Sequence, residues 1–240
     1  MALRIHTLGT SVLSRTAELA VVALEVSDTG ITQSSVLQEV TRTSNNLQSM
    51  LEALAPGTSS GADHPDTSTL IPPEGVAITR WSMSSLSTGS YIPWDSQRVE
   101  EQQGKPVHTA RTTFQITFCD FAKLGQVVSD LIKLPCVSVM SIDWRLTDAT
   151  KQQMSKTSRK QAVENAVTKA RDYADVLRKT HVEALEVNDI DPGGYPRPAA
   201  AYASNTNRLL ASGAHQDGAL HFTPQSCDVQ CSVKVLFEAT

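Results

Sequence analysis

A strict alternation of apolar residues with others near the end of the chain predicts a β-strand over residues 229–238. The apolar positions recur at every second residue: Val229, Cys231, Val233, Val235 and Phe237. A period of two places these side chains on one face of a sheet. The same period predicts a strand over residues 110–118, in which Phe114, Ile116 and Phe118 share a face. Further short apolar segments predict strands at residues 3–8, 19–27, 76–86, 137–146 and 183–190.

Helical periodicity marks two segments in the first 140 residues. Residues 34–54 place their apolar side chains within an arc of about 100° around the helix axis. Residues 120–134 carry a similar stripe, and each segment is followed closely by a proline, which stops a helix. Within the strand at 76–86, the apolar parity shifts between Ile78 and Trp81, which predicts a β-bulge near Arg80.

The segment 161–177, QAVENAVTKARDYADVL, separates into two faces when its residues are placed about 100° apart around a helix axis. Its charged residues share one face, and small side chains on the other allow a close approach to a neighbouring element. Because Arg159 would fall on the apolar face, the pattern predicts a helix from about residue 159 to His181. Residues 148–158 are then a lead-in or an exposed extension. The apolar face consists of Ala162, Val163, Ala166, Val167, Ala170, Tyr173, Ala174 and Leu177.

The predicted order of elements indicates the fold class. Strand–helix–strand occurs twice, from residue 19 to 86 and from residue 110 to 146, which is the order of split-βαβ folds. We therefore predict an α+β fold: one or more largely antiparallel sheets with two or three packing helices, a long alanine-rich helix and a C-terminal strand. We expect residues 1–240 to form a single domain with long loops at 55–75, 87–107 and 192–224.

Four segments together resemble the SIMPL-domain family, also called the DUF541 family. IHTLGTSVL followed by AELAVVALEV is similar to the family's opening pair of strands around a glycine. VLQEVTRTSNNLQSMLEAL lies where the first long helix of the family lies, and RKQAVENAVTKARDYADVL is similar to its alanine-spaced helix. FTPQSCDVQCSVKVLFEAT is similar to the closing strand of the family, which typically follows a proline.

This resemblance implies an α+β fold and a tendency to form oligomers, which are ring-like or channel-like in some members. The roles proposed for the family are in stress responses and signalling, without an established reaction or catalytic residues to carry over. Two features depart from the family pattern. Bacterial members generally carry an export signal, which the first residues here do not resemble, and the connections 55–75 and 192–224 are longer than expected.

Charge and apolar content narrow the class of protein further. The net charge of -4 makes nucleic acid an unlikely partner, because nucleic-acid-binding domains are usually strongly basic. No stretch approaches the roughly 20 apolar residues that span a bilayer. We expect a soluble, cytoplasmic protein, unless an export signal was removed ahead of residue 1. Cys227 and Cys231 would lie about 13 Å apart on one strand, so we expect reduced thiols in the core.

Candidate chemistry is sparse. The six histidines show no metal-ligand spacing and no catalytic motif is present, so we expect no metal, no cofactor and no assigned catalytic residue. Aromatic side chains in the connection 87–107 either pack on the domain or contact a partner. A basic run over residues 151–160 either faces solvent or meets an acidic partner or a phosphate. The candidate binding residues are Tyr91, Trp94, His108, Lys156, Arg159 and Lys160.

Two hypotheses for function follow. The first is a non-enzymatic protein that self-assembles into a homo-oligomer or binds a protein partner, in stress response or signalling. The alternative is an enzyme or small-ligand-binding protein whose pocket is formed by the loops 87–107 and 192–224, because long loops on a rigid sheet are where such sites arise.

Overall fold

The backbone groups into two compact units, each built from separate stretches of the chain. The computed structural model describes residues 2–54, 77–92, 106–190, 197–198, 220 and 222–240. Unit 1 comprises Met1–Glu18, Trp144–Thr206 and Gln225–Thr240, and unit 2 comprises Leu19–Asp143 and Asn207–Pro224.

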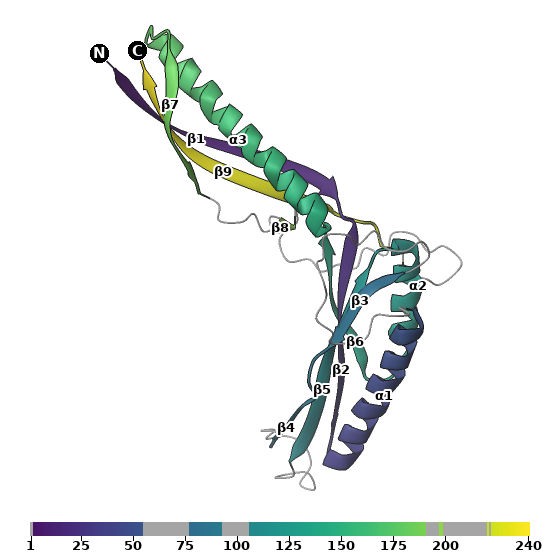
Figure 1. The fold of residues 1–240 in the computed structure, drawn as a ribbon. Helices are drawn as coiled ribbons and strands as arrows, with labels where there is room; N and C mark the ends of the chain where they lie inside the picture. The colour runs from purple at the N-terminus through teal and green to yellow at the C-terminus, as the bar shows by residue number, and fades with distance from the viewer. Residues whose placement is uncertain (1, 55–76, 93–105, 191–196, 199–219, 221) are drawn as a thin grey trace. The chain divides into compact units, whose positions relative to one another are not determined.

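Unit 1 is an antiparallel sheet with one long helix across it (Figure 1). The strands β1 (Leu3–Thr16), β9 (Ser226–Ala239) and β7 (Val182–Asp189) pair in that order, so the C-terminal strand is central. A short strand, β8 (Arg197–Pro198), pairs with the first residues of β9. The helix α3 (Asp148–Val176) lies against β1 and β9. The expected antiparallel sheet, long alanine-rich helix and C-terminal strand are all present.

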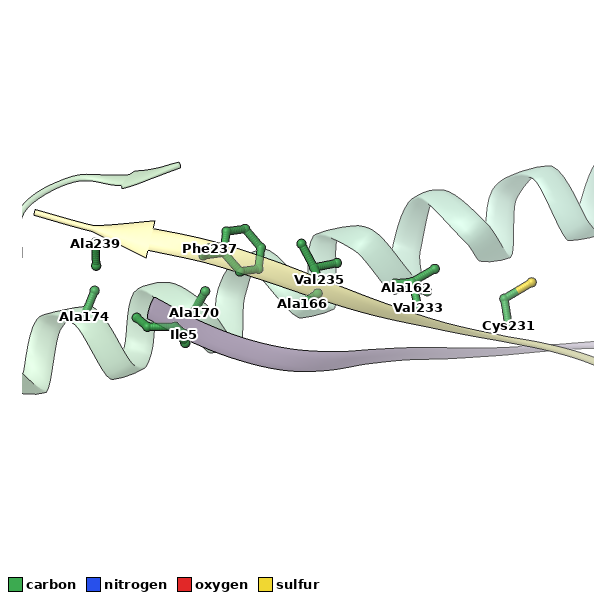
Figure 2. Close-up of a cluster of buried hydrophobic side chains, with 10 residues drawn as sticks. All are labelled: Ile5, Ala162, Ala166, Ala170, Ala174, Cys231, Val233, Val235, Phe237 and Ala239. Atoms are coloured by element: carbon green, nitrogen blue, oxygen red, sulfur yellow. The ribbon is translucent and has the colours of Figure 1, made fainter. Parts of the chain in front are cut away.

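Alanines form the contact between α3 and the sheet, as Figure 2 shows. Every second side chain of β9 points to this face and is buried, as the apolar alternation of residues 229–237 predicts. Four alanines spaced four residues apart are at most 1% exposed, and we call them the alanine stripe: Ala162, Ala166, Ala170 and Ala174. The larger side chains that the stripe covers are Ile5 of β1 and Val233, Val235 and Phe237 of β9.

Gly9 allows the backbone of α3 to approach β1. A Cβ atom at this position would lie 1.9 Å from the carbonyl oxygen of Ala162 and 2.9 Å from the Cβ of Ala166. Such contacts are far shorter than van der Waals distances, so only a residue without a side chain fits beneath the helix. The glycine in the first strand and the alanine stripe are therefore two halves of one close contact.

The predicted start of this helix and the predicted extent of its apolar face were both wrong. The helix begins at Asp148, with Thr147 as its N-cap, and Met154 and Ser158 are buried in line with the alanine stripe. Positions four residues apart advance by about 40° around a helix, so the buried line winds around α3 and leaves any fixed arc. For the same reason Tyr173 and Leu177, which were assigned to the apolar face, are 54% and 55% exposed.

The end of the helix also differs from the prediction. The helical residues stop at Val176 rather than near His181, and Leu177 forms the cap. Arg178 follows with a φ of 56°, the left-handed conformation that commonly ends a helix. The chain then turns into β7, whose first residue is Val182.

Unit 2 contains the predicted split-βαβ arrangement. Its elements, in chain order, are β2 (Leu19–Gly30), α1 (Gln33–Leu54), β3 (Ile78–Met83), β4 (Ser87–Tyr91), β5 (Val107–Phe118), α2 (Phe121–Leu131) and β6 (Val137–Arg145). The last two residues of β6 belong to unit 1. The sheet order is β3–β5–β2–β6, with both helices on one side (Figure 1).

The core of unit 2 confirms the sequence pattern of its central strand. Phe114, Ile116 and Phe118 of β5 are fully buried. The predicted bulge is also present, because the pairing of β3 with β5 shifts between Ile78 and Arg80.

Two predicted boundaries were wrong because polar residues hide edge strands. β1 continues to Thr16 instead of ending at residue 8, and its polar residues Thr7 and Ser11 are buried under α3. The start of the predicted loop 87–107 is instead β4, which pairs with β5 although every one of its side chains is exposed. Hydrogen bonding to β5, rather than apolar burial, holds this strand, so no apolar pattern marks it.

A single added methyl group tests the close contact of α3 with β1. Gly9→Ala should lower the free energy of unfolding by about 2 kcal/mol or more, because the helix must move or the new side chain must clash. An alanine in an ordinary strand position would instead be mildly stabilising relative to glycine. Urea unfolding followed by circular dichroism measures the difference.

The control is Gly89→Ala in β4, where the new Cβ would lie 3.3 Å from the hydroxyl oxygen of Thr109 at an exposed edge. It should change stability by less than about 1 kcal/mol. An equal effect of both substitutions would contradict the close contact.

Candidate interaction surface

One flank of α3 covers part of the free edge of β1. Gln161, Asn165 and Lys169 follow one another at four-residue intervals, which places them in line beside the alanine stripe. We call these three residues the polar flank. Its hydrogen bonds run from Ser11 Oγ to Gln161 Oε1 (2.9 Å), from Thr10 N to Asn165 Oδ1 (3.2 Å) and from Lys169 Nζ to Leu8 O (2.7 Å).

These bonds close the middle of the β1 edge to further strands. The backbone groups of an edge strand that point away from the sheet are a template for pairing with another chain. On β1 two of these groups, Leu8 O and Thr10 N, are already bonded to the polar flank. Because bonded and free positions alternate along an antiparallel strand, Arg4 and His6 also direct their backbone groups away from β9. Neither residue is bonded to the polar flank.

The opposite edge of the sheet, along β7, is open as far as the described residues go. His181 and Thr240 exchange both backbone hydrogen bonds, and Ile190 N donates to Ser232 O. The alternation of the ladder, interrupted by the bulge between Ala184 and Glu186, therefore turns the backbone groups of Val182, Ala184 and Val187 outward. Within the described ranges no strand pairs with this side of β7.

The face of this sheet opposite α3 is also uncovered by any described helix. It displays apolar side chains among charged ones, and Leu8 and Val12 are 48% and 57% exposed. Directly opposite residues share a face, so the pairing places Arg4, Glu238 and Glu183 in one row and His6, Leu236 and Glu186 in the next. Basic side chains thus lie on the β1 side of the face and acidic ones on the β7 side.

A carboxylate fixes the start of α3. Glu18 Oε2 accepts hydrogen bonds from Thr147 N (3.0 Å) and Thr147 Oγ1 (2.6 Å), and its Oε1 accepts one from Thr150 Oγ1 (2.9 Å). Arg15 Nη2 lies 3.1 Å from Oε1. Burial acts to raise the pKa of Glu18, but these hydrogen bonds and the charge of Arg15 outweigh it and hold the pKa below its ordinary value.

This arrangement predicts a pH dependence of stability. Because the folded pKa of Glu18 lies below the ordinary value of 4.5, the carboxylate stabilises the fold above that pH. Its contribution is lost as the pH falls through the folded pKa. Glu18→Gln should therefore lower the free energy of unfolding by about 1 kcal/mol at pH 7, and by less below pH 4.5.

Urea unfolding at a series of pH values measures this difference. Glu164→Gln removes an exposed carboxylate of α3 and serves as the control, with almost no expected effect at pH 7. A loss for Glu18→Gln that stays constant down to pH 3 would contradict the assigned role.

The candidate binding residues that the structure describes are divided between the two units. Tyr91 is exposed at the end of β4 and His108 is half-buried on β5. The pairing sets Tyr91 opposite Val107 and His108 opposite Ser90, so the two side chains lie on different faces of the sheet. Trp94 lies outside the described residues. Lys156, Arg159 and Lys160 are exposed on α3, in the other unit.

None of the four cysteines is part of a disulfide, as expected, but only two lie in the core. Cys227 and Cys231 are buried on β9, and Cys119 and Cys136 are half-buried in unit 2. Burial raises the pKa of the Cys119, Cys136 and Cys227 thiols, which keeps them protonated and weakly nucleophilic.

The predicted pocket falls mostly outside the described residues, which omit 93–105, 191–196 and 199–219. The structure does show one broad depression, of about 730 Å³, over α1. A single helix face lines it, and the guanidinium of Arg42 is paired with Glu39. Among the described residues that line it, no nucleophile lies beside a base. The described residues contain no group of three histidine, cysteine or acidic side chains able to hold a metal, and none of their helices is long and apolar enough to span a membrane.

A family model described as SIMPL, protein of unknown function (DUF541), matches residues 5–237, which include strands and helices of both units. No curated protein matches the chain.

Proposed function

The chain belongs to the SIMPL family, and from this premise we propose that it is a non-enzymatic protein that acts by self-assembly and partner binding. Stress response or signalling is the setting that the family suggests. We also propose that the two units together form one functional domain, since the family model covers both.

The observation that carries this proposal is the open sheet of unit 1. One edge and one face of it are uncovered within the described residues, and both expose apolar side chains. On the face these are Leu8 and Val12, and along β7 they are Leu185 and Val187, each about half exposed. Exposed edges and apolar faces favour association with another chain.

The four cysteine thiols support a cytoplasmic setting for this activity. Thiols at four positions, two of them only half-buried, are typical of a reducing compartment.

Light scattering coupled to size exclusion tests self-assembly directly. A monomer has a mass of 25.9 kDa, and we expect a larger particle at tens of micromolar whose mass falls on dilution. A mass equal to one chain throughout that range would contradict self-assembly and leave only binding to a different partner.

A further inference from the structure

The two edges of the unit 1 sheet are complementary in charge. On the open face, the row nearest the end of the sheet runs Arg4, Glu238, Glu183 from β1 to β7. The next row begins with His6 and ends with Glu186. The β7 edge therefore carries two exposed carboxylates on this face, and the first residues of β1 carry a guanidinium and an imidazole.

The backbone at these two edges is equally complementary. The outward groups of Val182, Ala184 and Val187 offer N–H and C=O positions along β7. The outward backbone groups of Arg4 and His6 offer N–H and C=O positions on β1. From Leu8 onward the polar flank bonds the outer side of that strand. Opposed edges with unpaired backbone groups extend a sheet from one molecule into the next.

We propose that the β7 edge of one copy pairs with the Leu3–His6 segment of β1 in a second copy. This inference rests on the proposed self-assembly and names the contact that makes it. In this pairing Arg4 and His6 of the second copy lie beside Glu183 and Glu186 of the first copy. Leu3 and Ile5 then lie on the other face, beside Val182 and Ala184.

The same geometry limits how the contact grows. Leu8 O and Thr10 N are bonded to Lys169 and Asn165, so the added pairing stops after His6 and spans about four residues, roughly 13 Å. The two partners use different surfaces, which makes the contact head-to-tail. Such contacts repeat until they close into a ring or continue as a filament.

Charge reversal at each edge tests this contact. Glu183→Lys with Glu186→Lys should raise the dissociation constant for assembly at least tenfold, measured by light scattering, because the attraction between Glu183 and Arg4 becomes repulsion. Arg4→Glu with His6→Glu should weaken it similarly. The chain carrying all four substitutions should assemble again, since the pairs are restored with reversed sign. Misfolding of either double variant cannot produce that recovery.

The matched control is Asp172→Lys with Asp175→Lys, which makes the same change of charge on exposed residues of α3. It should assemble like the unchanged chain, and circular dichroism should show every variant folded. If the Glu183 and Glu186 variant assembles normally, the edge contact is wrong while self-assembly stands. The edge contact is also wrong if the fourfold variant stays dissociated although folded. If the unchanged chain is a monomer, the proposed self-assembly fails, and the edge contact with it.

Discussion

The close approach of α3 to the β1–β9 pair is the constraint on which unit 1 depends. An alanine side chain buries little apolar surface, and each methylene-sized group contributes only about 0.8 kcal/mol. The alanine stripe therefore matters less for its own burial than for what it permits. Its small side chains allow the helix to pack closely on Ile5, Val233, Val235 and Phe237, which supply most of the apolar surface removed from water. Gly9 extends the same contact to the backbone of β1.

Polar contacts follow from this approach and give the sheet its asymmetry. Thr7 Oγ1 donates to the carbonyl oxygen of Ala166, so a buried hydroxyl is satisfied by the helix that buries it. On the flank beside the stripe, longer polar side chains reach around β1 and bond its outer backbone. The helix thereby closes the middle of one sheet edge, whereas the β7 edge has no such cover among the described residues. A contact made for packing thus decides which edge can take another chain.

The sequence predicted those parts of the fold in which side-chain burial follows a simple period. The central strands β5 and β9 are buried on one face only, so their alternation is clear. The edge strand β4 has only exposed residues, and β1 buries the hydroxyl residues Thr7 and Ser11 beside its apolar ones, so neither strand has a full apolar pattern. The sequence pattern predicted the alanine stripe. Because the buried line rotates around the helix, a fixed apolar arc did not predict its continuation before Arg159.

The interaction surface was harder to predict than the fold, because it depends on pairing between distant segments. Arg4 and Glu183 have no relation in sequence, and only the register of β1, β9 and β7 places them at opposite edges of one face. Local composition indicates the aromatic and basic candidates, but it carries no information on strand register. The four-residue spacing of Gln161, Asn165 and Lys169 was a usable signal, since it runs beside the alanines along a helix already predicted.

Site-resolved hydrogen exchange of the amides of β9 tests the central contact most directly. If α3 lies closely on a sheet in which β9 is central, the amides of residues 233–237 should exchange only through global unfolding, as the slowest amides of unit 1 do. Their exchange should be far slower than that of the outward amides of β7. If residues 233–237 exchange as fast as the β7 edge, α3 does not hold the sheet, and this account of the fold and its surface is wrong.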